Sequence, residues 1–219
     1  HAPGNFSRPV RYSQNWVGVK YHIRYPFPDD LIALHTFNGG YCGISRIEDG
    51  LCCLCYLVKA SQLKKEAGSI TALEKHILST NKHLKAIFCD ADFLGRKPVT
   101  VSNVKFEVRR PVHDKVFYLG DSAGSIAPLS GNGMSMALRA AYHLSEQLNA
   151  FYEGRQPLDQ IARNYKKLWL TNFRARINLG RRIQFFFCQP LLTGFLIRLV
   201  AFIPILRQQI IRSTHGQPF

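Results

Sequence analysis

One stretch near the middle of the sequence combines a carboxylate with several glycines. Gly120-Asp121-Ser122 follows the apolar run 115–119, and Gly131-Asn132-Gly133 precedes a helical pattern that begins at Met134. A carboxylate accepts hydrogen bonds from hydroxyl groups, so Asp121 suits a polyol chain. Glycines at the start of a helix leave backbone N–H groups accessible, at the end where the helix carries partial positive charge. The stretch therefore predicts a ligand that joins a polyol to an anionic or electron-rich ring.

The residues around this stretch predict how it is held. Lys115–Leu119 is short, apolar and rich in β-forming residues, which indicates a buried strand. An aspartate at the carboxyl end of such a strand points into the crevice that binds ligands in open α/β sheets. The small residues 122–124 should let a flat ligand approach the backbone, and Pro128 should fix the loop. We therefore expect Asp121 to face the start of the helix across a cleft with room for a ring.

This stretch resembles the second FAD-contacting motif of the para-hydroxybenzoate hydroxylase and geranylgeranyl reductase group of flavoproteins. That motif is an apolar strand, Gly-Asp-Ala/Ser, a spacer, Pro, and then Gly-x-Gly and a helix. The matching residues here are Val116–Leu119, Gly120, Asp121, Ser122, Pro128, Gly131, Asn132, Gly133 and Met134. The resemblance implies FAD as the cofactor, with Asp121 bonded to the ribityl hydroxyls and the loop 128–134 along the isoalloxazine. A strand, loop and helix that only turn a corner would explain the glycines but not the aspartate.

The upstream residues predict an antiparallel sheet of about four strands, in the ranges 16–24, 31–37, 41–47 and 51–58.

Gly39-Gly40-Tyr41-Cys42-Gly43 resembles a G-G-Y-x-G stretch of the family's substrate domain, without the Trp and Phe-Pro of lipid-reducing members. A tight turn with strand flanks is the alternative. Tyr41, His35 and His22 lie on predicted strands that could face the substrate, or they are ordinary packed or exposed strand residues.

The sequence divides into four expected parts. Residues 1–15 resemble an Ala-Asp-Gly-x-x-Ser-x-x-Arg motif of the family, with Pro3 at the Asp position, and would be the remnant of an upstream FAD-binding region. Residues 16–110 would form the substrate domain, 111–153 the FAD-contacting strand, loop and helix, and 154–219 basic helices. The expected fold class is α/β plus α+β: the carboxyl-terminal portion of a Rossmann-like FAD-binding domain, an antiparallel-sheet domain and a helical segment.

The resemblance implies an FAD-dependent oxidoreductase, either a monooxygenase or a reductase, that acts on a small or lipid-like organic substrate. No Gly-x-Gly-x-x-Gly follows a predicted strand, and in the family that fingerprint holds the ADP half of FAD. We therefore expect the chain to be part of a longer flavoprotein and to bind FAD weakly by itself. No catalytic acid, base or nucleophile can be assigned from the sequence.

The charge distribution leaves a second class of function open. The formal net charge is +15, and from Arg155 onward eleven Lys and Arg residues face a single acid, Asp159. A basic module that binds an anionic ligand or a membrane surface, without catalysis, is the alternative to an enzyme. Arg198 and Pro204 interrupt the apolar run 190–206, which favours a buried or interfacial helix over a membrane span. No nucleic-acid motif is recognisable, so that partner is not expected.

The six cysteines do not predict a metal site. Cys52, Cys53 and Cys55 lack a second Cys or His pair at zinc-ligand spacing, and the run 51–58 reads better as a strand with cysteine as a small apolar residue. The first residues lack the charged-then-apolar pattern of a secretory leader, so we expect reduced thiols and a cytoplasmic setting, at the membrane periphery if the basic helices contact a membrane.

Overall fold

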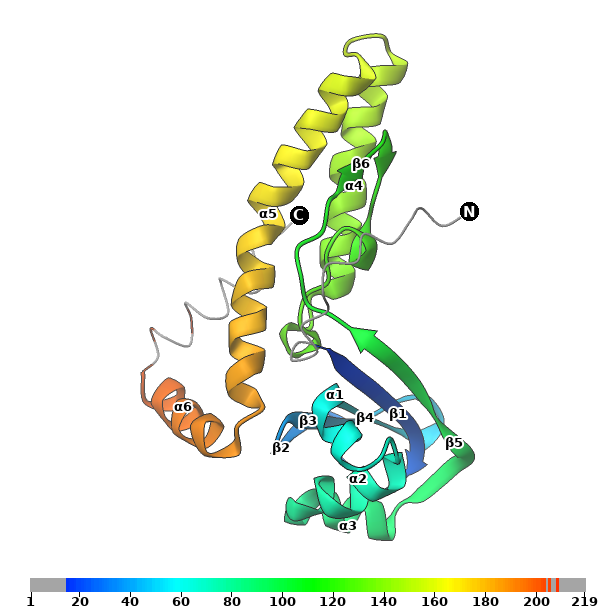
Figure 1. Cartoon of the computed structure of the whole chain (residues 1–219), viewed down its shortest axis with the longest axis vertical. Helices are drawn as coiled ribbons and strands as arrows, with labels where there is room; N and C mark the ends of the chain where they lie inside the picture. Colours follow the sequence, from blue (N-terminus) through cyan, green and yellow to red (C-terminus); the bar gives the residue numbers. More distant parts are fainter. Residues whose placement is uncertain (1–14, 204, 206–207, 209–219) are drawn as a thin grey trace. The chain divides into compact units, whose positions relative to one another are not determined.

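The computed structural model describes residues 15–203, 205 and 208, and the expected motif at the start of the chain lies outside these residues. The chain divides into two compact units, each shown in Figure 1. The first unit comprises the residues up to Lys105 together with Phe187–Pro190, and the second comprises 106–186 with the residues from Leu191 onward.

The first unit is built on a five-stranded antiparallel sheet in the order β2-β3-β4-β1-β5. Its strands are β1 (Trp16–Arg24), β2 (Ile32–Phe37), β3 (Gly40–Arg46), β4 (Cys52–Lys59) and β5 (Asp92–Val104). The four predicted strands are thus confirmed within a residue or two. The sheet is not a simple meander, because β1 lies between β4 and β5. The alternation of apolar and polar residues in 99–108 predicts a further strand, but only 99–104 are in a strand, as the end of the longer β5.

Three helices cover one face of this sheet: α1 (Ala60–Lys65), α2 (Ile70–His76) and α3 (Lys82–Asp90). The sequence of residues 69–79 predicts a helix, which is confirmed as α2 and a following 3-10 turn, whereas α1 and α3 were not predicted. Ser69 caps α2 by accepting a hydrogen bond from the backbone N–H of Ala72, and Asn81 caps α3 in the same way. These caps satisfy N–H groups that the first helical turn leaves without a partner.

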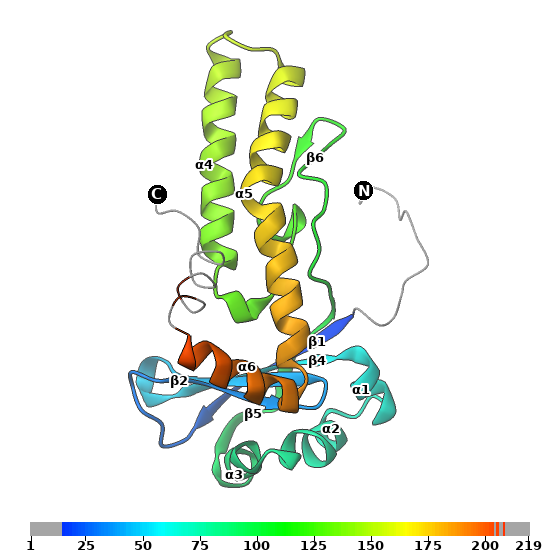
Figure 2. The ribbon, with the colours of Figure 1, turned by 90° about the vertical axis from the view of Figure 1, so that its left-hand side faces the viewer.

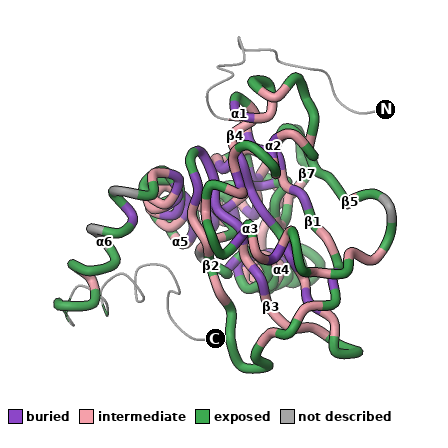
Figure 3. The backbone as a smooth tube through the Cα atoms, turned by 90° about the horizontal axis from the view of Figure 1, so that it is seen from below, coloured by how far each residue is buried: buried purple, intermediate pink, exposed green. Residues whose placement is uncertain are grey.

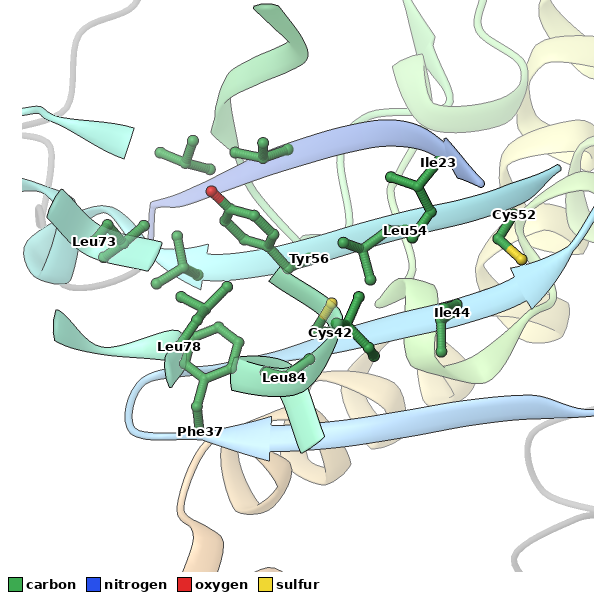
Figure 4. Close-up of a cluster of buried hydrophobic side chains, with 14 residues drawn as sticks. Ile23, Phe37, Cys42, Ile44, Cys52, Leu54, Tyr56, Leu73, Leu78 and Leu84 are labelled. Carbon is green, nitrogen blue, oxygen red and sulfur yellow. The ribbon is translucent and has the colours of Figure 1, made fainter. Parts of the chain in front are cut away.

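The core of the first unit lies between the sheet and these helices. Alternate residues of the strands point to one face because the side-chain period of a strand is two. Figure 4 shows the buried side chains of that face meeting those of the helices, among them Ile23, Cys42, Ile44, Cys52, Leu54, Tyr56, Leu73 and Leu84. Cysteine therefore serves as a small apolar residue in β3 and β4, as the sequence predicts for β4.

One carboxylate is held within this core. The hydroxyls of Tyr21 and Tyr56 both donate to Oε1 of Glu74, at 2.7 Å and 2.8 Å. Burial raises the pKa of Glu74, and the two hydrogen bonds oppose that rise. Glu74 lies three residues after Thr71, a spacing that predicts a capping box, but its carboxylate turns inward to the tyrosines and Ser69 caps the helix instead.

The second unit consists of a short hairpin, a loop and long helices. The hairpin pairs β6 (Val112–His113) with β7 (Val116–Phe117), and 3-10 turns follow at Gly120–Ser122 and Pro128–Ser130. Figure 2 shows α4 (Gly133–Tyr152) and α5 (Leu158–Phe187) side by side. The predicted helix after the glycines is confirmed as α4.

The prediction that Lys115–Leu119 is a buried strand is wrong. Only two of these residues are in a strand, and Val116 and Leu119 are 51% and 38% exposed. Among the described residues β7 pairs with β6 alone, so no neighbouring strand covers its other side. The apolar composition of the run therefore predicts more burial than the described residues of this chain provide.

Helix α5 is amphipathic along its full length. Its buried residues recur every three or four positions, at Ile161, Tyr165, Trp169, Phe173, Ile177, Gly180 and Gln184. That spacing places them in one stripe along the helix. Tyr165, Trp169, Phe173 and Ile177 pack with Met136, Ala140 and Leu144 of α4 in the core of the second unit. The basic residues of α5 fall outside the stripe and remain on the surface.

The last described helix, α6 (Pro190–Phe202), is apolar and largely exposed, as its mainly green tube in Figure 3 shows. No single described helix is long and apolar enough to cross a membrane. By length and composition, one bent pair of helices, Leu158–Phe187 with Leu192–Phe202, could do so, with a bend of 116° between them.

Candidate functional site

The Gly-Asp loop is held in place by backbone hydrogen bonds on both sides. The N–H of Ala123 donates to the carbonyl of Gly120 at 3.1 Å and closes the turn that carries Asp121. The N–H of Arg109 donates to the carbonyl of Ala123 at 3.0 Å, which ties the turn to the strand-like segment upstream. The same segment accepts a hydrogen bond from Ser125 at 3.1 Å. The position of the Asp121 backbone is therefore fixed by the fold of the second unit.

Helix α5 supports the loop from the other side. The hydroxyl of Tyr165 donates to the carbonyl of Tyr118 at 2.9 Å. Tyr165 is fully buried, and this burial raises its pKa to about 12. The hydroxyl therefore stays protonated and remains a donor at neutral pH. A buried tyrosine needs such a partner, because an unpaired buried hydroxyl is costly.

The small residues of the loop serve packing more than ligand approach. Ala123 is fully buried, and a Cβ added to Gly124 would lie 2.6 Å from the indole of Trp169 and 3.1 Å from Ile177. Such a contact is too close for a real side chain unless the indole shifts, so the packing of α5 favours glycine at position 124. The expectation that all three residues 122–124 open the backbone to a ligand is therefore wrong for Ala123 and Gly124; Ser122 is exposed.

The predicted cofactor-binding residues lie close together along the same loop and helix start. Most are on the surface: Asp121, Ser122, Pro128, Gly131, Gly133 and Met134 are exposed, and Gly120 is half-buried. Asn132 differs, because it is only 7% exposed and its carbonyl accepts hydrogen bonds from Met136 and Ser135. The structure thus brings these residues together on one loop, with Asn132 turned inward as a support. Their contact with a cofactor remains a prediction.

The start of α4 presents backbone donors to the surface. The first N–H with an acceptor inside the helix is that of Met136, which donates to Asn132 at 3.0 Å. The N–H groups of Gly133, Met134 and Ser135 come before it and have no acceptor within the helix. Gly131 adopts φ +66°, in the left-handed region, and this turn directs the chain into the helix. A helix that begins in this way favours an anionic or electron-rich group.

Among the residues that the structure describes, the predicted cleft is absent. The hollow behind the loop has a volume of about 10 Å³ and is lined by Gly120, Asp121, Gly124, Trp169, Phe173 and residues of α4. That volume is close to the minimum that holds one water molecule. Helix α5 and its aromatic side chains fill the space in which we expected room for a ring. A ring would have to lie against the exposed outer side of the loop and helix start.

The residues on this outer side fit the chemistry of FAD. The Asp121 carboxylate suits the hydroxyls of a ribityl chain, since it can accept several hydrogen bonds. The N–H groups at the start of α4 that have no acceptor within the helix suit the ring edge that becomes anionic when the flavin is reduced. The glycines at 131 and 133 have no side chain that would keep a flat ring away from the backbone.

Two of the three substrate candidates, His35 and Tyr41, do not share one face of the sheet. His35 pairs with Cys42, which belongs to the helix-covered core, and its ring stacks on His83 of α3 at 5.5 Å between centroids. Burial, and then the neighbouring His83, lowers the pKa of His35. Tyr41 pairs with Leu57 on the opposite face and is 6% exposed. A single pocket on this sheet therefore cannot use both side chains.

The glycines of the Gly-Gly-Tyr stretch have a structural reason. A Cβ on Gly40 would lie 2.4 Å from the carbonyl oxygen of Leu57 and 2.5 Å from the ring of Phe37. Gly39 adopts φ +85° and donates its N–H to the carbonyl of Cys188 at 3.0 Å. The tight-turn interpretation therefore accounts for both glycines without a ligand.

Sequence reasoning missed the residues of α5 that support the loop. Tyr165 bonds the carbonyl of Tyr118 before the Gly-Asp turn, and Trp169 and Ile177 pack at Gly124 after it, although they lie more than forty residues away in the sequence. The period of four along α5 identifies these residues as a buried stripe. It does not identify their partner.

Comparisons with known proteins place this arrangement among flavin-dependent enzymes by fold. The brominase Bmp2, which is flavin-dependent, superposes with a TM-score of 0.72 over 93% of this chain, at 18% identity. The FAD-dependent halogenase CndH gives 0.61 over 95% at 15% identity. A geranylgeranyl bacteriochlorophyll reductase-like protein from Thermoplasma acidophilum gives 0.62 over 85% at 15% identity. The chain shares its fold with flavin-dependent enzymes.

The sequence comparisons add less. No protein-family model matches the chain. Conditioned medium factor receptor 1 of Dictyostelium discoideum is 21% identical over 151 residues, which are 67% of this chain and 28% of that protein. The chain covers 51%, 53% and 46% of the lengths of Bmp2, CndH and the reductase-like protein. It therefore corresponds to about half of each of these structures.

Proposed function

We propose that this chain forms part of an FAD-dependent oxidoreductase, in which the Gly-Asp loop and the start of α4 hold the flavin half of the cofactor. The observation that carries the proposal is the loop itself. An exposed carboxylate and three helix N–H groups without helical acceptors lie within one short segment, on a fold shared with flavin-dependent enzymes. The proposed substrate is a small or lipid-like organic molecule, and the reaction is a hydroxylation or a reduction.

Within this proposal, each part of the loop has one role. When bound, FAD supplies the electron transfer to or from the substrate. Asp121 accepts hydrogen bonds from the ribityl hydroxyls and positions the ring. The N–H groups of Gly133 and Met134 stabilise negative charge at the edge of the ring, in the way that oriented donors stabilise developing charge in other enzymes. Tyr165 and Trp169 keep the loop in this geometry from behind.

The ADP half of FAD needs a second binding segment. The hollow behind the loop is too small for any part of the cofactor, and the chain covers about half the length of its structural relatives. We propose that a segment with a Gly-x-Gly-x-x-Gly turn, preceding this sequence in a longer protein, completes the site. The apolar side chains of Val116 and Leu119, which are exposed here, would then gain a neighbour.

The test compares the 219-residue chain with a longer protein that includes the natural upstream segment. The longer protein should purify with the visible absorbance of bound flavin, whereas the chain alone should bind FAD weakly or not at all. A flavin spectrum from the chain alone at equimolar protein would contradict the missing half. A colourless longer protein that cannot be loaded with FAD would contradict the proposal as a whole.

A matched pair of variants in the longer protein tests the role of the carboxylate. Asp121→Asn removes the charge and half of the acceptors, so FAD affinity should fall by about tenfold or more, because hydrogen bonds to charged groups are worth about 1.5–3 kcal/mol. Asp114→Asn is the control, since Asp114 is an exposed carboxylate of the nearby hairpin at φ +49°, which asparagine tolerates. Equal FAD affinities in the two variants would exclude Asp121 from the site.

A second candidate function is contact with an anionic membrane surface. The surface of α5 carries Arg163, Lys166, Lys167, Arg174, Arg181 and Arg182, and the half-buried Arg176 stacks on Phe173 at 5.9 Å. The observation that favours membranes is α6, where Leu192, Ile197, Leu199 and Phe202 are all exposed. Basic residues and exposed apolar groups together suit an interfacial helix. A protein with both features would work in the cytoplasm at the membrane periphery.

Sedimentation with liposomes distinguishes membrane binding from a basic surface that only increases solubility. The chain should sediment with vesicles that contain anionic lipid, and less so in high salt, because salt screens exposed charges. Arg181→Gln with Arg182→Gln should weaken the association. Lys82→Gln with Lys85→Gln, which removes two exposed charges from α3, should not. Association that ignores both lipid charge and salt would contradict an electrostatic membrane contact.

A further inference from the structure

An irregularity between β1 and β5 opens a cavity in the first unit. Lys20 pairs with Val99 and His22 pairs with Leu94, so one residue of β1 faces the four residues 95–98 of β5. Such an insertion lifts the longer strand away from its neighbour. A cavity of about 210 Å³ lies at this point, lined by Lys20, Tyr21, His22, Leu94, Lys97 and Val99.

The cavity lies on the side of the sheet that the helices do not cover. The side chain of Tyr21 points to the helices, where its hydroxyl reaches Glu74. Lys20 and His22, one position before and one after it, therefore point to the other side. Directly opposed residues of an antiparallel pair share a face, which places Val99 and Leu94 with them. Both polar and apolar groups thus line one open depression.

The charged groups of the cavity are all basic. The ammonium groups of Lys20 and Lys97 belong to its lining, and His22 adds an imidazole. No ion pair with a carboxylate involves either lysine among the described residues. The acidic residue of β5 nearest to this region, Asp92, is paired with Arg24 at 3.1 Å. An anion that entered the cavity would therefore meet cations without competition from acidic side chains.

The cavity also has an apolar lining, which a patch of positive charge alone would lack. Val99 is 67% exposed and Leu94 is half-buried, so a ligand that covered them would remove apolar surface from water. The volume is smaller than the roughly 300–1,000 Å³ typical of sites for drug-sized ligands. A ligand of matching size has one anionic group and a single small ring or a short aliphatic chain.

We propose that this cavity between β1 and β5 binds a small organic anion, a carboxylate with an apolar body, through Lys20, Lys97 and His22. The anionic group lies between the two ammonium groups, and the apolar body rests on Val99 and Leu94. This site belongs to the first unit alone and does not rest on the proposed flavin function. Its occupation can be measured in the chain without any cofactor.

Nitrogen-15 heteronuclear NMR on the full chain tests the proposal with three probes. Benzoate carries both the carboxylate and the apolar ring, inorganic phosphate carries only charge, and benzyl alcohol carries only the ring. Benzoate should shift the amide signals of residues 19–23 and 93–100 in a saturable way, and the other two probes should bind at least several-fold more weakly. Equal binding of phosphate and benzoate, or shifts spread over the basic surface, would overturn the assignment of an organic anion.

Matched lysine variants identify the groups responsible. Lys20→Met with Lys97→Met should weaken benzoate binding by about fivefold or more, because each exposed ion pair is worth roughly 0.2–1 kcal/mol and the pair acts on one carboxylate. Lys82→Met with Lys85→Met makes the same change of charge on α3 and should leave the affinity unchanged. Both double variants alter exposed side chains, and their spectra report whether the fold is intact. An equal loss in the two double variants would show that only net charge matters and would overturn the site.

Discussion

Two pairs of glycines in this protein illustrate different reasons for the same residue type. Gly40 and Gly124 are enclosed, and an added Cβ would lie 2.4 Å and 2.6 Å from the nearest atoms. Gly131 has no atom within 4 Å of such a Cβ, and Gly133 has only one contact, at 4.0 Å. The first pair is required by packing inside each unit. The second pair lies at an open helix start, where no neighbour in the described chain restricts the side chain.

The difference shows what sequence alone conveys about glycine. Gly40, Gly131 and Gly133 belong to motifs that resemble functional stretches of one flavoprotein group, and Gly124 lies in the spacer of one of these motifs. Contacts within the chain explain the enclosed pair without a ligand. They do not explain the open pair beyond the positive φ of Gly131, so the open pair carries the functional inference.

The largest expected effect is at Gly40. Gly40→Ala forces a Cβ against the carbonyl oxygen of Leu57, which belongs to the sheet backbone and cannot move aside without breaking the pairing of β3 with β4. We expect a loss of about 3 kcal/mol or more in the free energy of unfolding, as for severe overpacking. Denaturant titration followed at the Trp16 indole signal reports on the first unit.

Gly18→Ala is the control for this change. Its Cβ would lie 3.9 Å from Leu57 and 4.0 Å from Val101, which are ordinary contacts in the same sheet. The free energy of unfolding should change by less than about 0.5 kcal/mol, apart from a small gain because alanine has fewer unfolded conformations. Similar losses at the two positions would mean that Gly40 is not enclosed as described.

Gly124→Ala should have a smaller effect, because its main neighbour is a side chain. The new methyl group would meet the outer ring atoms of Trp169, which can shift at some cost. We expect a loss of about 1–3 kcal/mol in the free energy of unfolding, followed by the far-UV circular dichroism of the helices, a signal that does not depend on Trp169. Trp169→Phe removes those ring atoms, so the double variant should be more stable than the sum of the two single changes predicts. Additive losses would contradict the contact between the loop and α5.

The sequence predicts part of the fold and part of the candidate site. The strands of the first unit follow from their alternation, and α4 follows from its apolar spacing, because both patterns reflect burial within this chain. The length and burial of the strand before Asp121 were overestimated, because among the described residues no further strand covers its apolar side chains. The role of the loop residues as a cofactor site stays a prediction, and the cleft expected beside them was wrong for the described residues, because Trp169 and Phe173 approach from a helix that no local pattern links to the loop.

Gly131→Ala tests backbone strain at a position where the new Cβ would have no packing neighbour. The position adopts φ +66°, which costs a non-glycine residue roughly 1–2 kcal/mol, and asparagine tolerates this region better than alanine. Gly131→Ala should therefore lose about 1 kcal/mol of unfolding free energy, and Gly131→Asn clearly less. The measurement is the same titration at the Trp169 signal. Equal losses for alanine and asparagine would indicate that a packing contact, and not backbone strain, restricts position 131. Gly131 would then belong with the enclosed glycines.

Gly133→Ala should have the smallest effect on stability and the clearest effect on function. It is the first residue of α4, its added Cβ meets only Ile126 at 4.0 Å, and exposed substitutions of this kind change stability by less than about 0.5 kcal/mol. If the flavin ring lies against this helix start, the same methyl group would keep it away from the N–H groups. The longer protein with Gly133→Ala should therefore unfold like the parent yet bind FAD more weakly. Unchanged binding would mean that the opening at Gly133 reflects only the absence of neighbours in this chain, and the distinction between packed and functional glycines would then rest on Gly131 alone.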